Sequence, residues 1–126
     1  MSDVSEYIVY EDCPPRRIHN LLSPKWTSMV IYALGMRSFR TNELLRVMPG
    51  ISKKMLNQTL KELQAAGLIH RKVHQIIPPV VEYSLTELGQ KFVQPLMELY
   101  KWASTNADLL DQVDANLKLT QLEQAI

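Results

Sequence analysis

The sequence predicts a mainly α-helical domain with a small antiparallel β-wing (α+β), arranged as a winged helix-turn-helix with C-terminal dimerisation helices. Three observations predict this fold: a turn and capped helix over 49–69, two β-type segments directly after it, and two amphipathic helices at the end. We expect 1–126 to form a single domain, which is ordinary for this length. Its parts are an N-terminal arm (1–15), a core and wing (16–85) and dimerisation helices (86–126).

Two helices are expected in the first third of the chain. Pro14 and Pro15 should stop regular structure in the arm, after which a short helix follows. Ser23 and Pro24 are expected as the N-cap and first residue of the next helix, and Gly35 as its end. Between them the apolar residues follow the spacing i, i+3, i+4, i+7, i+8 of a core helix: Trp26, Met29, Val30, Ala33 and Leu34.

The segment 49–69 is typical of a turn followed by a helix. A shorter helix, capped by Thr41 or Asn42, should precede the turn. Ser52 is the expected N-cap of the second helix, and Gly67 should close it in the left-handed conformation. Its apolar residues recur at helical spacing and should face the core: Met55, Leu56, Leu60 and Leu63.

The opposite side of this helix, Ser52–Ala66, carries a mixture suited to DNA. Lysines neutralise phosphates, and Asn or Gln side chains can read base edges in a major groove. The predicted DNA-binding residues here are Ser52, Lys53, Lys54, Asn57, Gln58 and Lys61. The chain has a net charge of +1, but 37–74 alone holds eight Lys or Arg against two Asp or Glu, a net charge of +6 between acidic flanks. This asymmetry favours one surface that faces a polyanion.

The β-type segments 68–76 and 80–85 predict a hairpin whose Pro78-Pro79 pair prevents a tight turn. In the second segment, alternate residues should point inward: Val81, Tyr83 and Leu85. Basic side chains on the hairpin are candidates for contacts with flanking phosphates or the minor groove, and Arg40 is a candidate for a backbone contact. The hairpin candidates are Arg71, Lys72 and His74, with His70 beside them.

Two further helices are expected, from Thr86 to about Ala103 and from about Asp108 to Gln124, with a kink at Pro95. They carry more apolar surface than a small winged domain can cover, so we expect them to form a homodimer; the alternative is that they fold back on their own domain. A two-fold dimer would present two recognition helices about 34 Å apart to a pseudo-palindromic operator. The predicted dimerisation residues are Leu88, Phe92, Leu96, Leu99, Trp102 and Leu110.

Three segments, "DCPPRRIHNLLSPKW", "RTNELLRVMPGISKKMLNQTLKELQAAGLI" and "IPPVVEYSLTELGQKF", resemble the HxlR-type family of winged helix-turn-helix regulators in order and spacing. The resemblance spans Asp12 to Trp102 and implies a cytoplasmic, dimeric transcriptional regulator of bacteria or archaea, with the helix centred on Asn57 in the groove. Three sites depart from the family pattern, one of them Ser23-Pro24, where the family has two glycines. Thr41 stands where an aromatic residue is usual, and Val80 where Arg or Lys is usual, which removes one phosphate contact from the wing.

Cys13 is the single cysteine, which excludes an internal disulfide framework and fits a reducing cytoplasm. Arg16 and Arg17 lie nearby in the sequence. Some relatives use a cysteine in this segment for redox or electrophile sensing, and the resemblance maps that role onto Cys13. The alternative is an inert thiol near the dimer interface. A small-molecule effector is a second route to control, bound among residues that could equally be core: Met29, Tyr32, Phe92, Leu96 and Trp102.

Other functional classes find little support. We predict that the chain is not an enzyme, because it lacks a glycine-rich phosphate loop, paired acids in an apolar setting and a nucleophile-base spacing. His19, His70 and His74 do not form a metal constellation, so no metal or cofactor is expected. No segment is long and apolar enough to cross a membrane. The function predicted is sequence-specific binding of double-stranded DNA, and the alternative is a winged-helix protein-interaction module without DNA binding.

Overall fold

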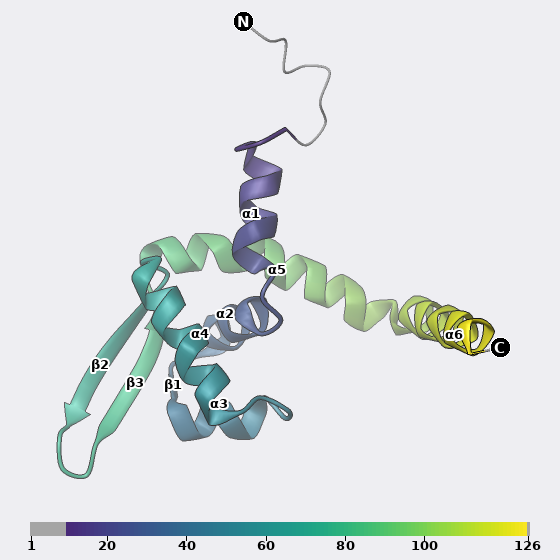
Figure 1. Cartoon of the computed structure of the whole chain (residues 1–126). Coiled ribbons are helices and arrows are strands. Elements are labelled where there is room, and N and C mark those ends of the chain that lie inside the picture. The colour runs from purple at the N-terminus through teal and green to yellow at the C-terminus, as the bar shows by residue number, and fades with distance from the viewer. Residues whose placement is uncertain (1–9, 126) are drawn as a thin grey trace, which may run out of the picture. The chain divides into compact units, whose positions relative to one another are not determined.

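The computed structural model describes residues 10–125, which form six α-helices and a three-stranded antiparallel sheet (Figure 1). The chain divides into two compact units, one ending at Val93 and the other beginning at Gln94. The fold class predicted from the sequence is confirmed. The elements are α1 (Pro14–Leu22), α2 (Thr27–Met36), β1 (Phe39–Arg40), α3 (Thr41–Val47), α4 (Lys53–Ala65), β2 (Ile69–Gln75), β3 (Val80–Leu85), α5 (Glu87–Thr105) and α6 (Ala107–Gln124).

The first helix starts earlier than expected. Pro14 and Pro15 begin α1 instead of stopping regular structure. The first N–H groups of a helix have no partner within the helix, so a proline, which has no backbone N–H, loses no hydrogen bond there. Ser23 does not cap α2. It ends α1, and its hydroxyl donates a hydrogen bond to the carbonyl of Asn20 (3.1 Å). A turn follows before α2 begins at Thr27.

Gly35 does not end α2, which continues to Met36. The residue serves packing instead. A Cβ atom at Gly35 would lie 2.5 Å from the Cγ2 methyl of Val93 on α5. Glycine therefore allows α5 to approach α2 closely, and the predicted helix end was wrong because the same residue type also serves close packing.

The expected boundaries of α4 are confirmed. The Ser52 hydroxyl accepts a hydrogen bond from the backbone N–H of Met55 (3.0 Å), and Gly67 closes the helix with a φ of 76°. The predicted inward position of Met55 is wrong, since its side chain is 46% exposed. Its place is taken by Thr59, whose hydroxyl is satisfied by the Met55 carbonyl (2.9 Å). The buried face is therefore Leu56, Thr59, Leu60 and Leu63, at the spacing i, i+3, i+4, i+7.

The sheet has the order β1-β3-β2, so β3 pairs on both edges. Phe39 of β1 lies opposite Tyr83 and is buried, and α3 begins directly after β1 with Arg40 as its N-cap, one residue before the expected caps. Tyr83 and Leu85 are buried and Val81 is half-buried, which confirms the alternation predicted for this strand. The β2–β3 hairpin projects from the helices of the first unit (Figure 1). This order holds the start of α3 beside the hairpin.

A small polar junction joins the end of α4 to the start of α5. The Thr86 hydroxyl donates to the carbonyl of Gly67 (2.7 Å) and accepts from the N–H of Gly89 (3.0 Å). The Thr86 N–H donates to the carbonyl of Leu68 (3.0 Å). A Cβ atom at Gly89 would collide with that same Leu68 carbonyl. Thr86 thus caps α5 and fixes the base of the hairpin against it.

Both C-terminal helices were expected close to their observed bounds. The first, α5, runs through Pro95 without ending. The second, α6, has no buried residue. Large apolar side chains therefore remain exposed along the second unit.

We predict that Gly89→Ala lowers the free energy of unfolding by about 1–3 kcal/mol, because the added methyl group meets the Leu68 carbonyl and the packed junction must shift. Gln90→Ala is the matched control: Gln90 is exposed on the same helix, so its substitution should cost no more than about 0.5 kcal/mol. Urea unfolding followed by circular dichroism measures both. Equal midpoints for the two variants would contradict the close approach at Gly89.

Candidate nucleic-acid interface

The exposed side of α4 is set by its buried side. A helix turns about 100° per residue, so Leu56, Thr59, Leu60 and Leu63 together define one inward direction. The predicted DNA-binding residues of this helix are all exposed: Ser52, Lys53, Lys54, Asn57, Gln58 and Lys61. Lys54 and Lys61 lie on the side opposite the buried face, whereas Lys53 and Asn57 lie on one flank.

Two of these six side chains already have partners. The Ser52 hydroxyl caps the helix, as described above. The Gln58 side-chain amide donates to the Glu62 carboxylate one turn later (2.8 Å). A base contact by Gln58 would therefore have to replace this hydrogen bond, whereas Asn57 has no such partner in the described part of the chain.

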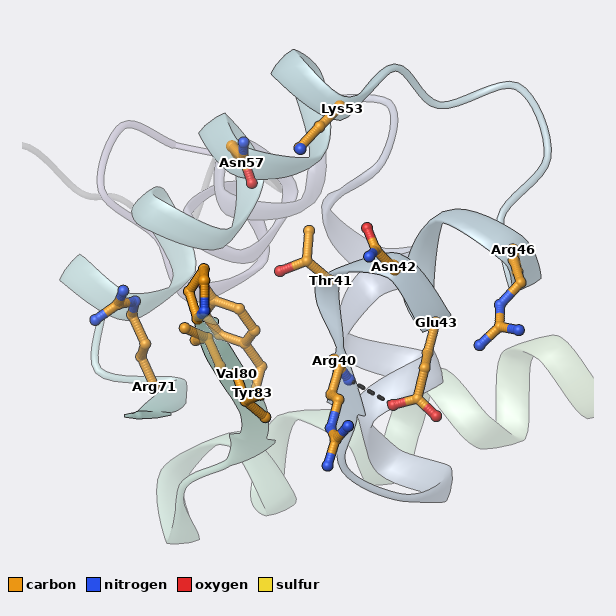
Figure 2. Close-up of a pocket in the computed structure, with 12 residues that line it drawn as sticks. Arg40, Thr41, Asn42, Glu43, Arg46, Lys53, Asn57, Arg71, Val80 and Tyr83 are labelled. Carbon is orange, nitrogen blue, oxygen red and sulfur yellow. Dashed lines mark hydrogen bonds between the residues drawn. The ribbon is translucent and has the colours of Figure 1, made fainter. Parts of the chain in front are cut away.

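The flank of α4 that carries Lys53 and Asn57 borders a cleft of about 620 Å³. Residues of α3, α4 and the hairpin line it. Figure 2 shows Lys53 and Asn57 on the α4 side, Thr41 and Asn42 on the α3 side, and Tyr83 and Val80 between these and Arg71. The lining residues are Arg40, Thr41, Asn42, Glu43, Arg46, Lys53, Asn57, Arg71, Pro79, Val80, Val81 and Tyr83.

The strand register separates the cations of the hairpin. Arg71 lies opposite Tyr83 and shares its face of the sheet, which puts Arg71 in the cleft. Lys72 lies opposite Glu82 and so belongs to the other face. Beyond Val73 the pairing shifts, and the His74 ring nitrogen Nε2 lies 3.4 Å from the Glu82 carboxylate. The structure therefore brings Arg71 to α4 but not Lys72 or His74.

Arg40 of β1 lies opposite Glu82, as Lys72 does, and lines the cleft only from its edge, whereas Arg46 lines it from α3. The sequence had marked Arg40 but had missed Arg46, Thr41 and Asn42 as neighbours of α4. Arg46 was visible only as one member of the basic tract 37–74. Its closeness to Asn57 depends on how α3 packs against α4, and no local pattern in the sequence reports that.

Among residues 10–125, Glu43 is the one acidic residue that lines the cleft. Its carboxylate accepts a hydrogen bond from the backbone N–H of Arg40 (2.8 Å) and lies 3.5 Å from the guanidinium of Arg37. The hydrogen bond to Arg40, with the positive charges of Arg37 and Arg40, lowers the pKa of Glu43, although burial opposes this. Glu43 therefore stays ionised at neutral pH, and its carboxylate is held by the Arg40 N–H at the start of α3.

Cys13 is buried, with only 1% of its surface exposed. It precedes α1 as N-cap, its N–H donates to the carbonyl of Tyr10 (3.1 Å), and its carbonyl accepts from Arg17 (2.9 Å). An oxidant or electrophile can therefore reach the thiol only after a local change exposes it.

The predicted dimerisation residues lie in both units. In the first unit Leu88 is exposed and Phe92 is half-buried. In the second unit Leu96 is buried, whereas the other three are exposed: Leu99, Trp102 and Leu110. The five residues considered for an effector cleft are also split between the units, so that expectation stays a prediction.

Residues 10–125 contain no group of three or more His, Cys, Asp or Glu side chains that could hold a metal ion. His19, His70 and His74 are exposed and lie on separate elements or strand positions. Within the same range, no helix is long and apolar enough to cross a membrane.

One family model matches most of this chain, and the similar proteins are described as transcriptional regulators. The model of the HxlR-like helix-turn-helix family matches residues 21–111. The uncharacterized HTH-type transcriptional regulator YkvN of Bacillus subtilis (strain 168) is 41% identical over 104 residues, covering 82% of this chain and 87% of YkvN.

Solved structures give the same result. A protein of Porphyromonas gingivalis W83, described as a MarR-family transcriptional regulator, is 42% identical with a TM-score of 0.73, over 79% of this chain and 97% of that one. The redox regulator HypR in its reduced form is 34% identical with a TM-score of 0.74, over 79% and 99% of the two chains. The chain therefore belongs to the HxlR-like helix-turn-helix family and is a transcriptional regulator of the winged helix-turn-helix type.

Proposed function

We propose that this regulator binds double-stranded DNA sequence-specifically as a homodimer in the cytoplasm, with Ser52–Ala66 in the major groove of each half of a pseudo-palindromic operator. The observation that carries the proposal is the two-sidedness of α4. Leu56, Leu60 and Leu63 anchor it in the core, while cations and amides occupy its exposed side. Such a helix can enter a groove without giving up its packing.

The exposed side chains differ in role. Asn57 has an uncommitted amide, which can bond both N6 and N7 of an adenine, so it is the residue proposed to read a base. Lys53, Lys54 and Lys61 neutralise phosphates. Arg40 and Arg71, at the borders of the cleft, contact the backbone on either side of the helix. Ser52 contributes to DNA binding mainly by capping α4. Gln58 can contact DNA only after its hydrogen bond to Glu62 breaks.

The hairpin is proposed to contact the flanking backbone or the minor groove. Lys72 and His74 lie away from the cleft, so their contacts belong to DNA beyond the segment that α4 reads. The contact between His74 and Glu82 (3.4 Å) weakens the case for His74 as a phosphate ligand.

A homodimer is supported by the second unit. Many large apolar side chains of this unit are exposed, and exposed apolar surface is a common mark of a protein–protein interface. Folding back onto the same domain remains the alternative. The exposed large apolar side chains of the second unit are Met97, Leu99, Trp102, Leu109, Leu110, Val113, Leu117, Leu119 and Leu122.

Control by oxidation or an electrophile at Cys13 is part of the proposal, because the relative HypR is described as a redox regulator. Since the thiol is buried, modification would first need a local change that exposes it.

The second candidate function is a protein-interaction module. It predicts no steep dependence of binding on salt, whereas neutralisation of phosphates gives a linear log–log decrease. The basic face of α4 favours DNA. An enzymatic role is not proposed, since the relatives are transcriptional regulators.

Asn57→Ala should weaken binding to the preferred site, selected from random duplexes, by about 1–3 kcal/mol, while binding to random DNA stays nearly unchanged. The reason is that a base contact discriminates among sequences and a phosphate contact does not. Fluorescence anisotropy on both duplexes measures this. Gln64→Ala, an exposed position near the end of α4, is the control and should change neither affinity. An equal loss on both duplexes would remove Asn57 from base reading.

Lys54→Ala should instead weaken binding to every sequence and reduce the slope of log K against log salt by about one unit, as expected for one lost phosphate contact. Titrations at four or more salt concentrations give the slope. An unchanged slope would show that Lys54 does not neutralise a phosphate.

Trp102→Glu should raise the dimer dissociation constant at least about 30-fold, since a buried interface tryptophan commonly contributes 2 kcal/mol or more. Gln90→Glu adds the same charge at an exposed position of α5 and should leave association unchanged. Sedimentation equilibrium measures both variants. An unmodified chain that sediments as a monomer at micromolar concentration would refute the homodimer.

A further inference from the structure

The cleft beside α4 has an apolar floor. Its base consists of the Tyr83 ring, which is buried, with Val80 and Val81 of the same strand and Pro79 before them. The volume of about 620 Å³ lies within the roughly 300–1,000 Å³ range of small-molecule sites. A flat ring system would fit against this floor.

The rim of the cleft is cationic and unpaired. Arg40, Arg46, Lys53 and Arg71 line it against the single acid Glu43, a net charge of +3. Glu43 is already held by the Arg40 N–H and by Arg37, which lies outside the cleft. In residues 10–125, none of the four lining cations has a carboxylate within 4.0 Å. Four unpaired cations around an apolar floor favour an anion with an apolar body.

Thr41 and Val80 both line this cleft, the first with a small hydroxyl side chain and the second with an aliphatic one. Figure 2 shows the side chains of Lys53, Asn57 and Thr41 around one space above Val80 and Tyr83. An ammonium, an amide and a hydroxyl can donate to one carboxylate there.

We propose that this cleft binds a small aromatic carboxylate, with the ring on Val80 and Tyr83 and the carboxylate held by Lys53, Asn57 and Thr41, and that the bound acid competes with DNA. Competition follows because Lys53 and Asn57 line the cleft and also belong to the face of α4 that is proposed to bind DNA. This second part rests on the proposed function, whereas binding of the acid to the free protein does not. With the acid at ten times its dissociation constant, competition lowers the apparent DNA affinity about tenfold.

Titration of the ¹⁵N-labelled full chain with sodium 1-naphthoate tests the site without DNA. Saturable shifts are expected at the backbone amides of Thr41, Asn57 and Tyr83. Neutral 1-naphthamide has nearly the same shape and should bind at least fivefold more weakly. No saturable binding, equal binding of the amide, or shifts confined to α5 and α6 would overturn the site.

Variants locate the site. Thr41→Phe fills the cleft and should abolish naphthoate binding, and Lys53→Gln should weaken it at least threefold. Lys101→Gln, at an exposed position of α5 outside the cleft, should bind as the unmodified chain does. Urea unfolding of each variant verifies that it folds. Undiminished binding to both Thr41→Phe and Lys53→Gln would contradict the site.

Anisotropy with the selected duplex tests the competition. Naphthoate at ten times its dissociation constant should lower the DNA affinity of the unmodified chain about tenfold and that of Thr41→Phe less than twofold. Bound naphthoate without any effect on DNA affinity would refute competition. A chain that binds naphthoate but no duplex even at low salt would uphold the site and overturn the proposed function.

Discussion

Burial of three leucines on α4 is the constraint on which the exposed polar face of that helix depends. Leu56, Leu60 and Leu63 are each at most 1% exposed, and each contributes about 1.5–3 kcal/mol relative to an exposed side chain. Because the helix has 3.6 residues per turn, fixing these three inward fixes the direction of every other side chain on it. The polar face is thus a consequence of the apolar one, and Ser52 sets the residue at which the helix starts.

The order of the sheet supplies the rest of the surface. Since β3 lies between β1 and β2, it holds the start of α3 on one side and the basic strand of the hairpin on the other. Segments far apart in the sequence, around residues 40–46, 53–57 and 71–83, therefore meet at one cleft. The junction at Thr86 and Gly89 ties the end of the hairpin to the start of α5.

The sequence was sufficient where the determinants are local. Ser52, Gly67 and the leucine spacing predict α4, and alternation predicts the inward side chains of β3. It failed where one residue type serves several purposes: Ser23 ends a helix instead of starting one, and Gly35 makes room for Val93 inside a helix. Met55 was misplaced because it lies about 90° from the centre of the buried face, where either environment fits the period.

For the candidate site too, the sequence predicted what local spacing determines and missed what depends on packing. The exposed face of α4 followed from its period. The separation of Arg71 from Lys72 did not, because a shift of one residue in strand register exchanges their faces. Arg46 was missed because its place in the cleft depends on packing between two helices, and the unpaired state of the lining cations appears only once Glu43 is seen to be engaged elsewhere.

Selection of duplexes bound by the full chain from random DNA tests the central claim most directly. Two copies of α4 related by a two-fold axis should enrich a pseudo-palindrome with half-site centres about 10 base pairs, or about 34 Å, apart. Enrichment of a single unpaired half-site would contradict the dimer. No enrichment at low salt would contradict DNA reading by α4 altogether.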